Sequence, residues 1–121
     1  MRNQPKYSFL KNSSYALKGL KDMIRTERSF QIEIVLAILL SPILFIFDLS
    51  FENKMLMLIT LFGVLIAESI NSAIERVVDL FTLEHHVLAG AAKDIGSTLV
   101  FLNIVLFILV WGISLFRYFY L

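Results

Sequence analysis

Three long apolar stretches limit what this chain can fold into more than any other feature of its sequence. They fall at about residues 32–51, 55–80 and 95–119, and each reaches the roughly 20 residues that an α-helix needs to cross a bilayer. Hydrophobic residues make up 58% of the 121 residues, more than one small soluble core needs. The sequence therefore predicts an all-α membrane protein with three transmembrane helices, in which residues 1–121 form a single integral-membrane domain.

The segment before the first span is basic and amphipathic. Residues 1–28 hold seven basic side chains against two acidic ones. Between about residues 6 and 26, apolar side chains recur at spacings of three and four among lysines, which indicates a helix lying on the membrane surface. Basic flanks usually face the cytoplasm, so we expect the N-terminus inside the cell and, after three crossings, the C-terminus outside. A dedicated lipid or nucleotide patch is an alternative interpretation of these charges.

Two polar connections separate the spans. The polar residues between Asp48 and Lys54 predict a short turn after the first span. Residues 82–94 predict a loop or a helix start at the membrane surface. The third span ends in aromatic side chains, beginning with Trp111, that we expect to form a belt at the opposite surface.

An acidic stripe runs along the second span. Its members stand at i, i+3, i+7 and i+11, which places them on one helix face: Glu68, Asn71, Glu75 and Asp79. Each carboxylate costs on the order of 2 to 3 kcal/mol at bilayer depth, so the stripe must face a bundle interior or water. Such a stripe is typical of proton pathways as well as membrane enzymes, so a small proton-coupled transporter and an assembly subunit are alternatives. Asn71 can also join helices by hydrogen bonding.

Further charged side chains border the same end of the spans. Glu27 and Glu33 flank the start of the first span, so Glu27 can meet Glu75 near the membrane surface. Paired carboxylates suit a hard cation such as Mg2+, which proteins commonly hold together with phosphate oxygens. Lys93, followed by Asp94, supplies a cation for a phosphate. The sequence contains no GxxxxGK[ST] loop and no cysteine, which excludes a Walker-type nucleotide site and thiolate chemistry.

Two motifs carry a resemblance to a known family. The segment ESINSAIERVVD at residues 68–79 resembles the signature E-x-x-N-[ST]-A-I-E-x-x-x-D of the small prokaryotic diacylglycerol kinases. AAKDIGS at residues 91–97 matches the same family, and YALKGL at 15–20 and TERSF at 26–30 fall at its spacings. The resemblance covers essentially the whole chain, including the three-span layout.

The resemblance implies a lipid kinase, a homotrimer with active sites shared between neighbouring subunits, and MgATP as the phosphoryl donor. Glu68 matches the catalytic base, which takes the proton from the lipid hydroxyl. Glu27 and Glu75 match carboxylates that hold the metal and contact ATP. Asn71 and Ser97 match positions near the lipid headgroup, beside Glu68. The other positions assigned to ATP are Tyr15, Glu84, His86, Lys93 and Asp94, and Asp79 and Glu33 are assigned supporting roles.

Two acceptor lipids fit the resemblance. The GSTLV segment at residues 96–100 and the aromatic third span resemble the diacylglycerol branch. We therefore predict ATP-dependent phosphorylation of diacylglycerol to phosphatidic acid in the bacterial inner membrane. Undecaprenol, which other family members phosphorylate, is the alternative acceptor. His85 and Val87 depart from residues common in the family, so nucleotide contacts there can differ.

Overall fold

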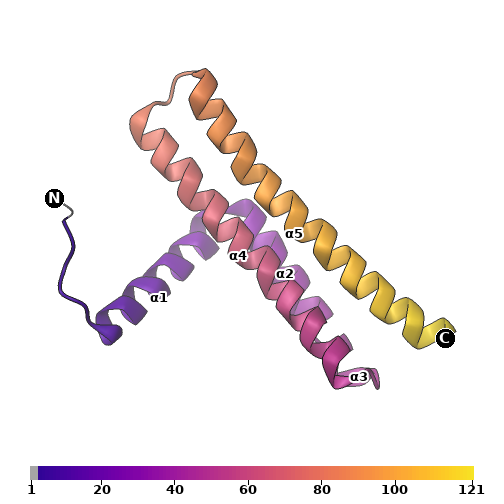
Figure 1. Ribbon diagram of the computed structural model, residues 1–121. Coiled ribbons are helices and arrows are strands. Elements are labelled where there is room, and N and C mark those ends of the chain that lie inside the picture. Colours follow the sequence, from indigo (N-terminus) through magenta and orange to yellow (C-terminus); the bar gives the residue numbers. More distant parts are fainter. Residues whose placement is uncertain (1–2) are drawn as a thin grey trace.

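The computed structural model describes residues 3–121 and contains five helices (Figure 1). They are α1 (Phe9–Thr26), α2 (Arg28–Leu40), α3 (Ile43–Ile46), α4 (Phe51–Phe81) and α5 (Val87–Tyr120). No strand occurs among these residues, so the predicted all-α class is confirmed for the part of the chain that the structure describes.

Three segments are long and apolar enough to cross a membrane, one for each span that the sequence predicts. They are Arg28–Ile46, Phe51–Phe81 and Val87–Tyr120. With 31 and 34 residues, α4 and α5 are the longest helices. At 1.5 Å per residue their lengths are roughly 46 and 51 Å, against about 30 Å of hydrocarbon in a bilayer. Both helices therefore extend beyond the hydrocarbon.

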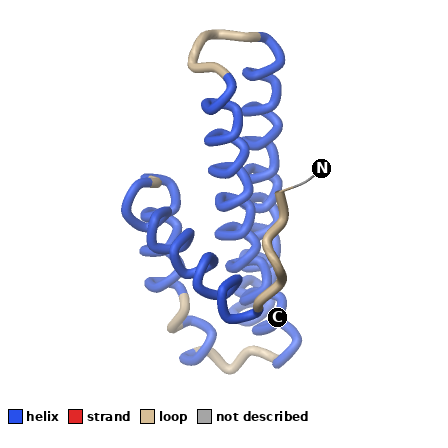
Figure 2. The backbone as a smooth tube through the Cα atoms, turned by 90° about the vertical axis from the view of Figure 1, so that its left-hand side faces the viewer, coloured by secondary structure: helices blue, strands red, loops and turns tan. Residues whose placement is uncertain are grey.

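An antiparallel hairpin of α4 and α5 forms the long axis of the molecule, and α2 lies along α4 (Figures 1 and 2). Residues 82–86 connect the two long helices at one end of the hairpin. The C-terminus and α3 lie at the other end. In Figure 1, α1 leaves this bundle at a steep angle, and its N-terminal end lies apart from the other helices.

The first span is broken where the sequence has Ser41 and Pro42. Proline lacks the backbone N–H that a helix interior needs, so the regular hydrogen-bond pattern cannot continue through it. The Ser41 hydroxyl donates to the Ile38 carbonyl at 2.9 Å, and the chain resumes as the short helix α3. The two pieces together supply the apolar length of one span.

The polar turn predicted from Asp48 to Lys54 is shorter than expected. Ser50 caps α4, because its side chain accepts a hydrogen bond from the Asn53 backbone N–H at 3.2 Å. Glu52 and Lys54 therefore lie in the first turn of the helix, where the negative charge of Glu52 also suits the helix dipole. Serine is a preferred N-cap, so Ser50 is the signal in the sequence that marks this helix start.

The third helix likewise begins earlier than the predicted span. His86 caps α5 by accepting a hydrogen bond from the Leu88 N–H on Nδ1 at 3.1 Å. Lys93 and Asp94 consequently lie within the second turn of a helix, and their directions are fixed by the helix.

An apolar core fills the end of the hairpin near α3. It consists of Leu44, Leu49, Met57, Leu61 and Trp111. The Trp111 indole N–H donates to the Met57 carbonyl at 2.9 Å, and only 4% of the Trp111 surface is exposed. Trp111 was predicted as an interfacial anchor, and that prediction is wrong for this residue because its ring packs between helices.

Most apolar side chains of the spans are exposed in the single chain. Helix α2 buries only Phe30, and α5 buries only Gly96, Trp111 and Ser114. Apolar surface of this extent requires lipid tails or neighbouring subunits as its surroundings. The homotrimer itself stays a prediction, as does the position of α1 on the membrane surface.

Candidate active site

A polar pocket of about 400 Å3 opens between the start of α2 and the facing sides of α4 and α5. It is lined by Glu27, Arg28, Ser29, Glu68, Asn71, Glu75, Ser97 and Val100. Five of these eight residues were selected from the sequence as site residues. The stripe on α4 and the start of the first span therefore meet in one cavity.

The deepest polar side chains of this pocket come from α4. Glu68 is 6% exposed and Asn71 is 7% exposed. The Asn71 side-chain N–H donates to Glu75 Oε1 at 3.3 Å, which links two members of the stripe one helical turn apart. The Asn71 Oδ1 atom is buried and has no hydrogen-bond partner within the described residues. A buried acceptor without a donor is costly, so this atom is a candidate contact for a ligand hydroxyl.

Gly96 allows α5 to approach Asn71. A Cβ atom added at Gly96 would lie 2.3 Å from Asn71 Oδ1 and 3.3 Å from its Cγ. Any larger residue there would have to displace the amide. The glycine of the AAKDIGS segment thus sets the position of a pocket side chain on the neighbouring helix.

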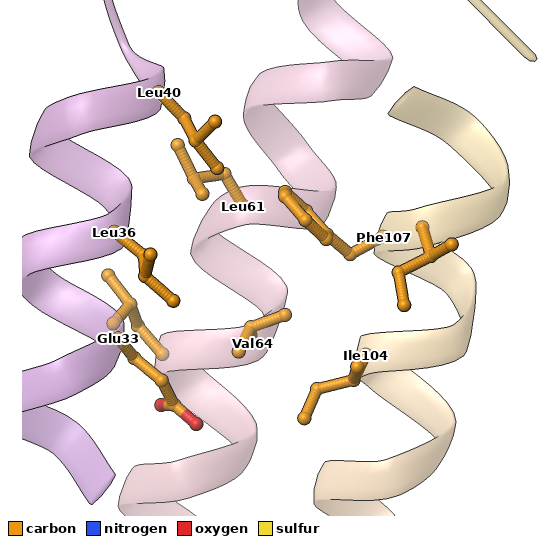
Figure 3. Close-up of a pocket in the computed structure, with 9 residues that line it drawn as sticks. Glu33, Leu36, Leu40, Leu61, Val64, Ile104 and Phe107 are labelled. Atoms are coloured by element: carbon orange, nitrogen blue, oxygen red, sulfur yellow. The ribbon is translucent and has the colours of Figure 1, made fainter. Parts of the chain in front are cut away.

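Glu33 lies in an adjoining apolar groove of about 180 Å3 instead of in the polar pocket. Figure 3 shows leucine, valine, isoleucine and phenylalanine side chains of three helices facing this groove, with the Glu33 carboxylate at one end. The lining residues are Glu33, Leu36, Leu40, Leu61, Val64, Leu65, Ile104, Phe107 and Ile108. Glu33 Oε2 is buried without a hydrogen-bond partner in the described part of the chain.

A second polar pocket, of about 280 Å3, lies under the connection between α4 and α5. It includes three residues predicted to contact ATP, which are Glu84, His86 and Lys93. Lys93 Nζ lies 2.7 Å from Asp79 Oδ1, and both side chains are nearly half exposed. The two residues were selected separately from the sequence, and the ion pair between them was not foreseen.

Two predicted ATP contacts lie outside both pockets. Asp94 lines neither of them. Tyr15 is 54% exposed on α1, the helix that points away from the bundle. The structure of the single chain therefore brings Glu27, Glu68 and Glu75 together, but it does not bring Tyr15 to them.

Arg76 also belongs to this region, although it was not predicted as a site residue. Arg76 follows Glu75 and donates hydrogen bonds to Glu27, Thr26 and Asp22 at the junction of α1 and α2. The family signature leaves its position open, and its partners are about 50 residues away in sequence. No local pattern suggests the pairing, because basic side chains outnumber acidic ones between residues 21 and 28.

The carboxylates of the polar pocket fit a hard divalent cation, because they present oxygen ligands. Residues 3–121 contain no ready-made cluster of three or more histidine or carboxylate ligands. Mg2+ is commonly held by only one or two carboxylates, with water and phosphate oxygens filling the other positions. Glu27 and Glu75 supply that number.

Several known proteins are similar to this chain along most of its length. The family model described as prokaryotic diacylglycerol kinase matches residues 14–115. The diacylglycerol kinase of Haemophilus influenzae is 37% identical over 107 residues, covering 88% of this chain and 91% of that protein. The diacylglycerol kinase of Escherichia coli K12 is 36% identical over 110 residues, with 91% and 90% covered. An undecaprenol kinase of Bacillus subtilis is 37% identical over 89 residues, with 74% and 72% covered.

Three apolar helices around a pocket of carboxylates, together with these matches, define a membrane-embedded kinase. The chain belongs to the prokaryotic diacylglycerol kinase family. It is thus an enzyme, and the transporter and assembly-subunit alternatives raised by the acidic stripe no longer apply. Membership of a lipid kinase family implies ATP and a lipid as its substrates.

Proposed function

We propose that this enzyme transfers the γ-phosphoryl group of ATP to the hydroxyl of diacylglycerol, which gives phosphatidic acid and ADP, at the bacterial inner membrane. The observation that carries the proposal is the pocket in which the buried carboxylate of Glu68 lies beside Glu75 and Glu27. Such a site holds a base at depth and two further carboxylates nearer the helix ends, as phosphoryl transfer to a membrane alcohol requires.

Glu68 is the base in this proposal. It accepts the proton of the acceptor hydroxyl as the lipid oxygen bonds to the γ-phosphorus, and the bond from that phosphorus to the ADP oxygen breaks. A base must lie within hydrogen-bond reach of the proton that it takes. The buried position of Glu68 between apolar helices suits a hydroxyl that belongs to a lipid. Asn71 and Ser97, which line the same pocket, orient the headgroup by hydrogen bonds.

Glu27 and Glu75 are the residues that would hold Mg2+ with the ATP phosphates. The cation, when bound, neutralises charge on the transferring phosphoryl group. Lys93 and His86 lie at the neighbouring pocket under the loop, where Glu84 also lies, and these residues are proposed to bind the nucleotide. Asp94 follows Lys93 on the same helix and is proposed to contact ATP from there. Asp79 supports the site by holding Lys93.

The apolar groove beside Glu33 supports an amphiphilic acceptor. It is lined by aliphatic and aromatic side chains along most of its length and ends at the Glu33 carboxylate (Figure 3). Glu33 lies close in sequence to Arg28 and Ser29, which line the polar pocket. In this proposal a lipid chain occupies the apolar part, and its hydroxyl points past Glu33 toward Glu68 in the polar pocket. The same groove also suits the chain of undecaprenol, and the relative from Bacillus subtilis makes this lipid the second candidate acceptor.

The proposed orientation has the N-terminus in the cytoplasm and the C-terminus outside. It rests on the basic residues before the first span and on the polar pockets, since ATP is available in the cytoplasm. The homotrimer with shared active sites is proposed from the family resemblance and from the extent of exposed apolar surface on α2 and α5. A neighbouring subunit would also bring the nucleotide contacts that the single chain leaves apart, Tyr15 among them.

Phosphorylation in lipid micelles tests the proposal. Purified protein is given MgATP with either diacylglycerol or undecaprenol, and the phosphorylated lipid is measured for the wild type and for Glu68→Gln. Product from diacylglycerol with the wild type, reduced about 100-fold or more in the variant, supports both the acceptor and the base. Product mainly from undecaprenol would move the enzyme to the other acceptor, and an active Glu68→Gln would remove Glu68 from the role of base.

A further inference from the structure

Helix α1 is attached to the rest of the molecule through very little packing. None of its residues is buried. It is separated from α2 by a single residue with extended backbone, Glu27, with φ −101° and ψ 108°. Next to this hinge, the Gln31 side chain donates to the Ile24 carbonyl at 2.8 Å. Apolar packing within the chain therefore does not set the direction of α1, whereas polar contacts near the hinge restrict it.

Arg76 supplies three of these contacts from α4. Its guanidinium donates through Nη2 to Thr26 Oγ1 at 3.0 Å and to Glu27 Oε1 at 2.9 Å, and through Nη1 to Asp22. Thr26 in turn donates to the Asp22 carbonyl at 2.8 Å. Guanidinium has a rigid planar arrangement of donors, so contacts to three acceptors fix an angle as well as a distance.

We propose that Arg76 is a positioning residue for the nucleotide and metal side of the active site, which it serves by fixing the direction of α1 and the place of the Glu27 carboxylate. The inference rests on the proposed function for its kinetic consequence. Arg76 donates a hydrogen bond to Glu27 Oε1, which holds the carboxylate at the edge of the polar pocket. Glu27 Oε2 remains as an acceptor for another group.

The contacts of Arg76 lie at the hinge, so a small change of angle there moves residues farther along α1 by several ångströms. Tyr15 lies 11 residues before the last residue of α1, roughly 16 Å along the helix from the hinge. A change of about 20° in helix direction moves a point at that distance by on the order of 5 Å. Both ion pairs are partly exposed and add little to stability. Their loss would nevertheless allow the angle between α1 and the bundle to change, and this angle determines where Tyr15 lies.

The contacts of Arg76 with Asp22, Thr26 and Glu27 are called the clamp below. Distance measurement on the whole chain tests the clamp separately from catalysis. The sequence has no cysteine, so spin labels can be placed at Lys11→Cys on α1 and Leu80→Cys on α4 without removing native thiols. Doubly labelled chains are diluted with unlabelled protein in lipid nanodiscs, and the distance distribution is recorded by pulsed electron resonance. Arg76→Gln is expected to broaden and shift the distribution, Arg76→Lys to do so less, and Asp22→Asn to do so in the same direction.

Kinetics provide the second measurement. Arg76→Gln is expected to raise the KM for MgATP about fivefold or more, with a smaller change in kcat and in the KM for lipid. Arg25→Gln is the control, because it also removes one positive charge, but from α1. Arg25 is exposed and forms no ion pair among the described residues, so this variant should change neither the distance distribution nor the KM.

The possible results separate the alternatives. An unchanged distance distribution in Arg76→Gln overturns the clamp, and a raised KM in that case would identify Arg76 as a direct phosphate contact. A broadened distribution with an unchanged KM would overturn the link to the nucleotide side. Absence of lipid phosphorylation by the wild type would defeat the proposed function, whereas the distances would still decide whether Arg76 fixes α1.

Discussion

The two ends of the α4–α5 hairpin use the same pair of helices in opposite ways. At the end near α3, Trp111 fits between the helices and its N–H is paired with the Met57 carbonyl. At the other end, Glu68 and Asn71 are buried at nearly the same level of exposure, but the surrounding space is a polar pocket. One end is packed and the other holds a cavity lined by carboxylates.

The two ends also differ in whether their buried polar atoms have hydrogen-bond partners. The indole N–H of the packed end is satisfied, whereas the side-chain atoms that are buried without a partner in the described residues lie toward the acidic end: Glu33 Oε2, Asn71 Oδ1 and Ser72 Oγ. Unpaired polar atoms cost stability. The packed end therefore stabilises the hairpin, and the acidic end retains groups that are free to bind substrates or neighbouring subunits, as the proposed function requires.

The largest effect expected on stability comes from Trp111→Ala. Truncation leaves a cavity and an empty place beside the Met57 carbonyl, and comparable losses in soluble cores cost about 3–5 kcal/mol. We expect a value at the lower end, since lipid already removes part of the hydrophobic contribution. Denaturant titration in micelles measures it, with exposed Phe116→Ala as the control. Equal losses of stability in both variants would show that packing around Trp111 contributes no more to the free energy of unfolding than an exposed aromatic side chain does.

Glu75→Gln should affect the acidic end alone. On the proposed function Glu75 holds the metal, so its loss is expected to reduce activity roughly 10- to 100-fold and to raise the Mg2+ concentration needed for half of the maximal rate. The helices and the proposed homotrimer should persist, because Glu75 is only half buried. Activity as a function of Mg2+ and size-exclusion chromatography measure the two properties. A dissociated oligomer with unchanged Mg2+ dependence would mark Glu75 as a structural residue.

Gly96→Ala tests whether close helix approach is also needed at the acidic end. The added methyl group would overlap Asn71 Oδ1, so the amide must turn or α5 must shift. Overpacking of this kind typically costs about 1–3 kcal/mol, and the KM for the lipid should rise because Asn71 lines the pocket. Gly112→Ala on the same helix is the control, since a Cβ atom there meets nothing within 4 Å. Equal kinetics for the two variants would contradict the role given to Gly96.

The smallest effect is expected from Asp79→Asn. The ion pair with Lys93 is exposed and screened by salt, so stability should hardly change. Lys93 becomes free to turn, and we expect at most a few-fold change in the KM for MgATP that becomes weaker as salt rises. Kinetics at low and high salt measure it. A loss as large as that of Glu75→Gln would instead place Asp79 among the residues that bind the cation or nucleotide.

Features governed by periodicity and hydrophobicity could be predicted from the sequence. The three spans follow from apolar length, and the placement of Glu68, Asn71 and Glu75 on one face follows from helix geometry. Helix starts were misplaced because Ser50 and His86 act as caps through local backbone geometry, which apolar patterning does not report. Trp111 was misassigned because the same residue type serves both as an interfacial anchor and as a buried packing residue.

The meeting of Glu27 with Glu75 could be predicted from the order of the spans, but the contacts of Arg76 could not. The pairing of Arg76 with the junction at Glu27 and the direction of α1 depend on each other, and the local sequence around the single extended residue reports neither. The distance of Tyr15 from the pockets follows from the same angle. The roles of individual site residues rest on resemblance and chemistry, and the kinetic variants above test them.

The hairpin is longer than the hydrocarbon that it crosses, and this has a consequence for how the reaction responds to concentration. On the proposed function, the acceptor reaches Glu68 by diffusing in the plane of the bilayer, while the nucleotide arrives from water at the protruding helix ends. The enzyme thus works at a phase boundary and transports neither substrate across it. Its rate should follow the mole fraction of acceptor in the membrane, so diluting that acceptor with inert lipid should slow turnover even when its amount per volume of solution stays constant.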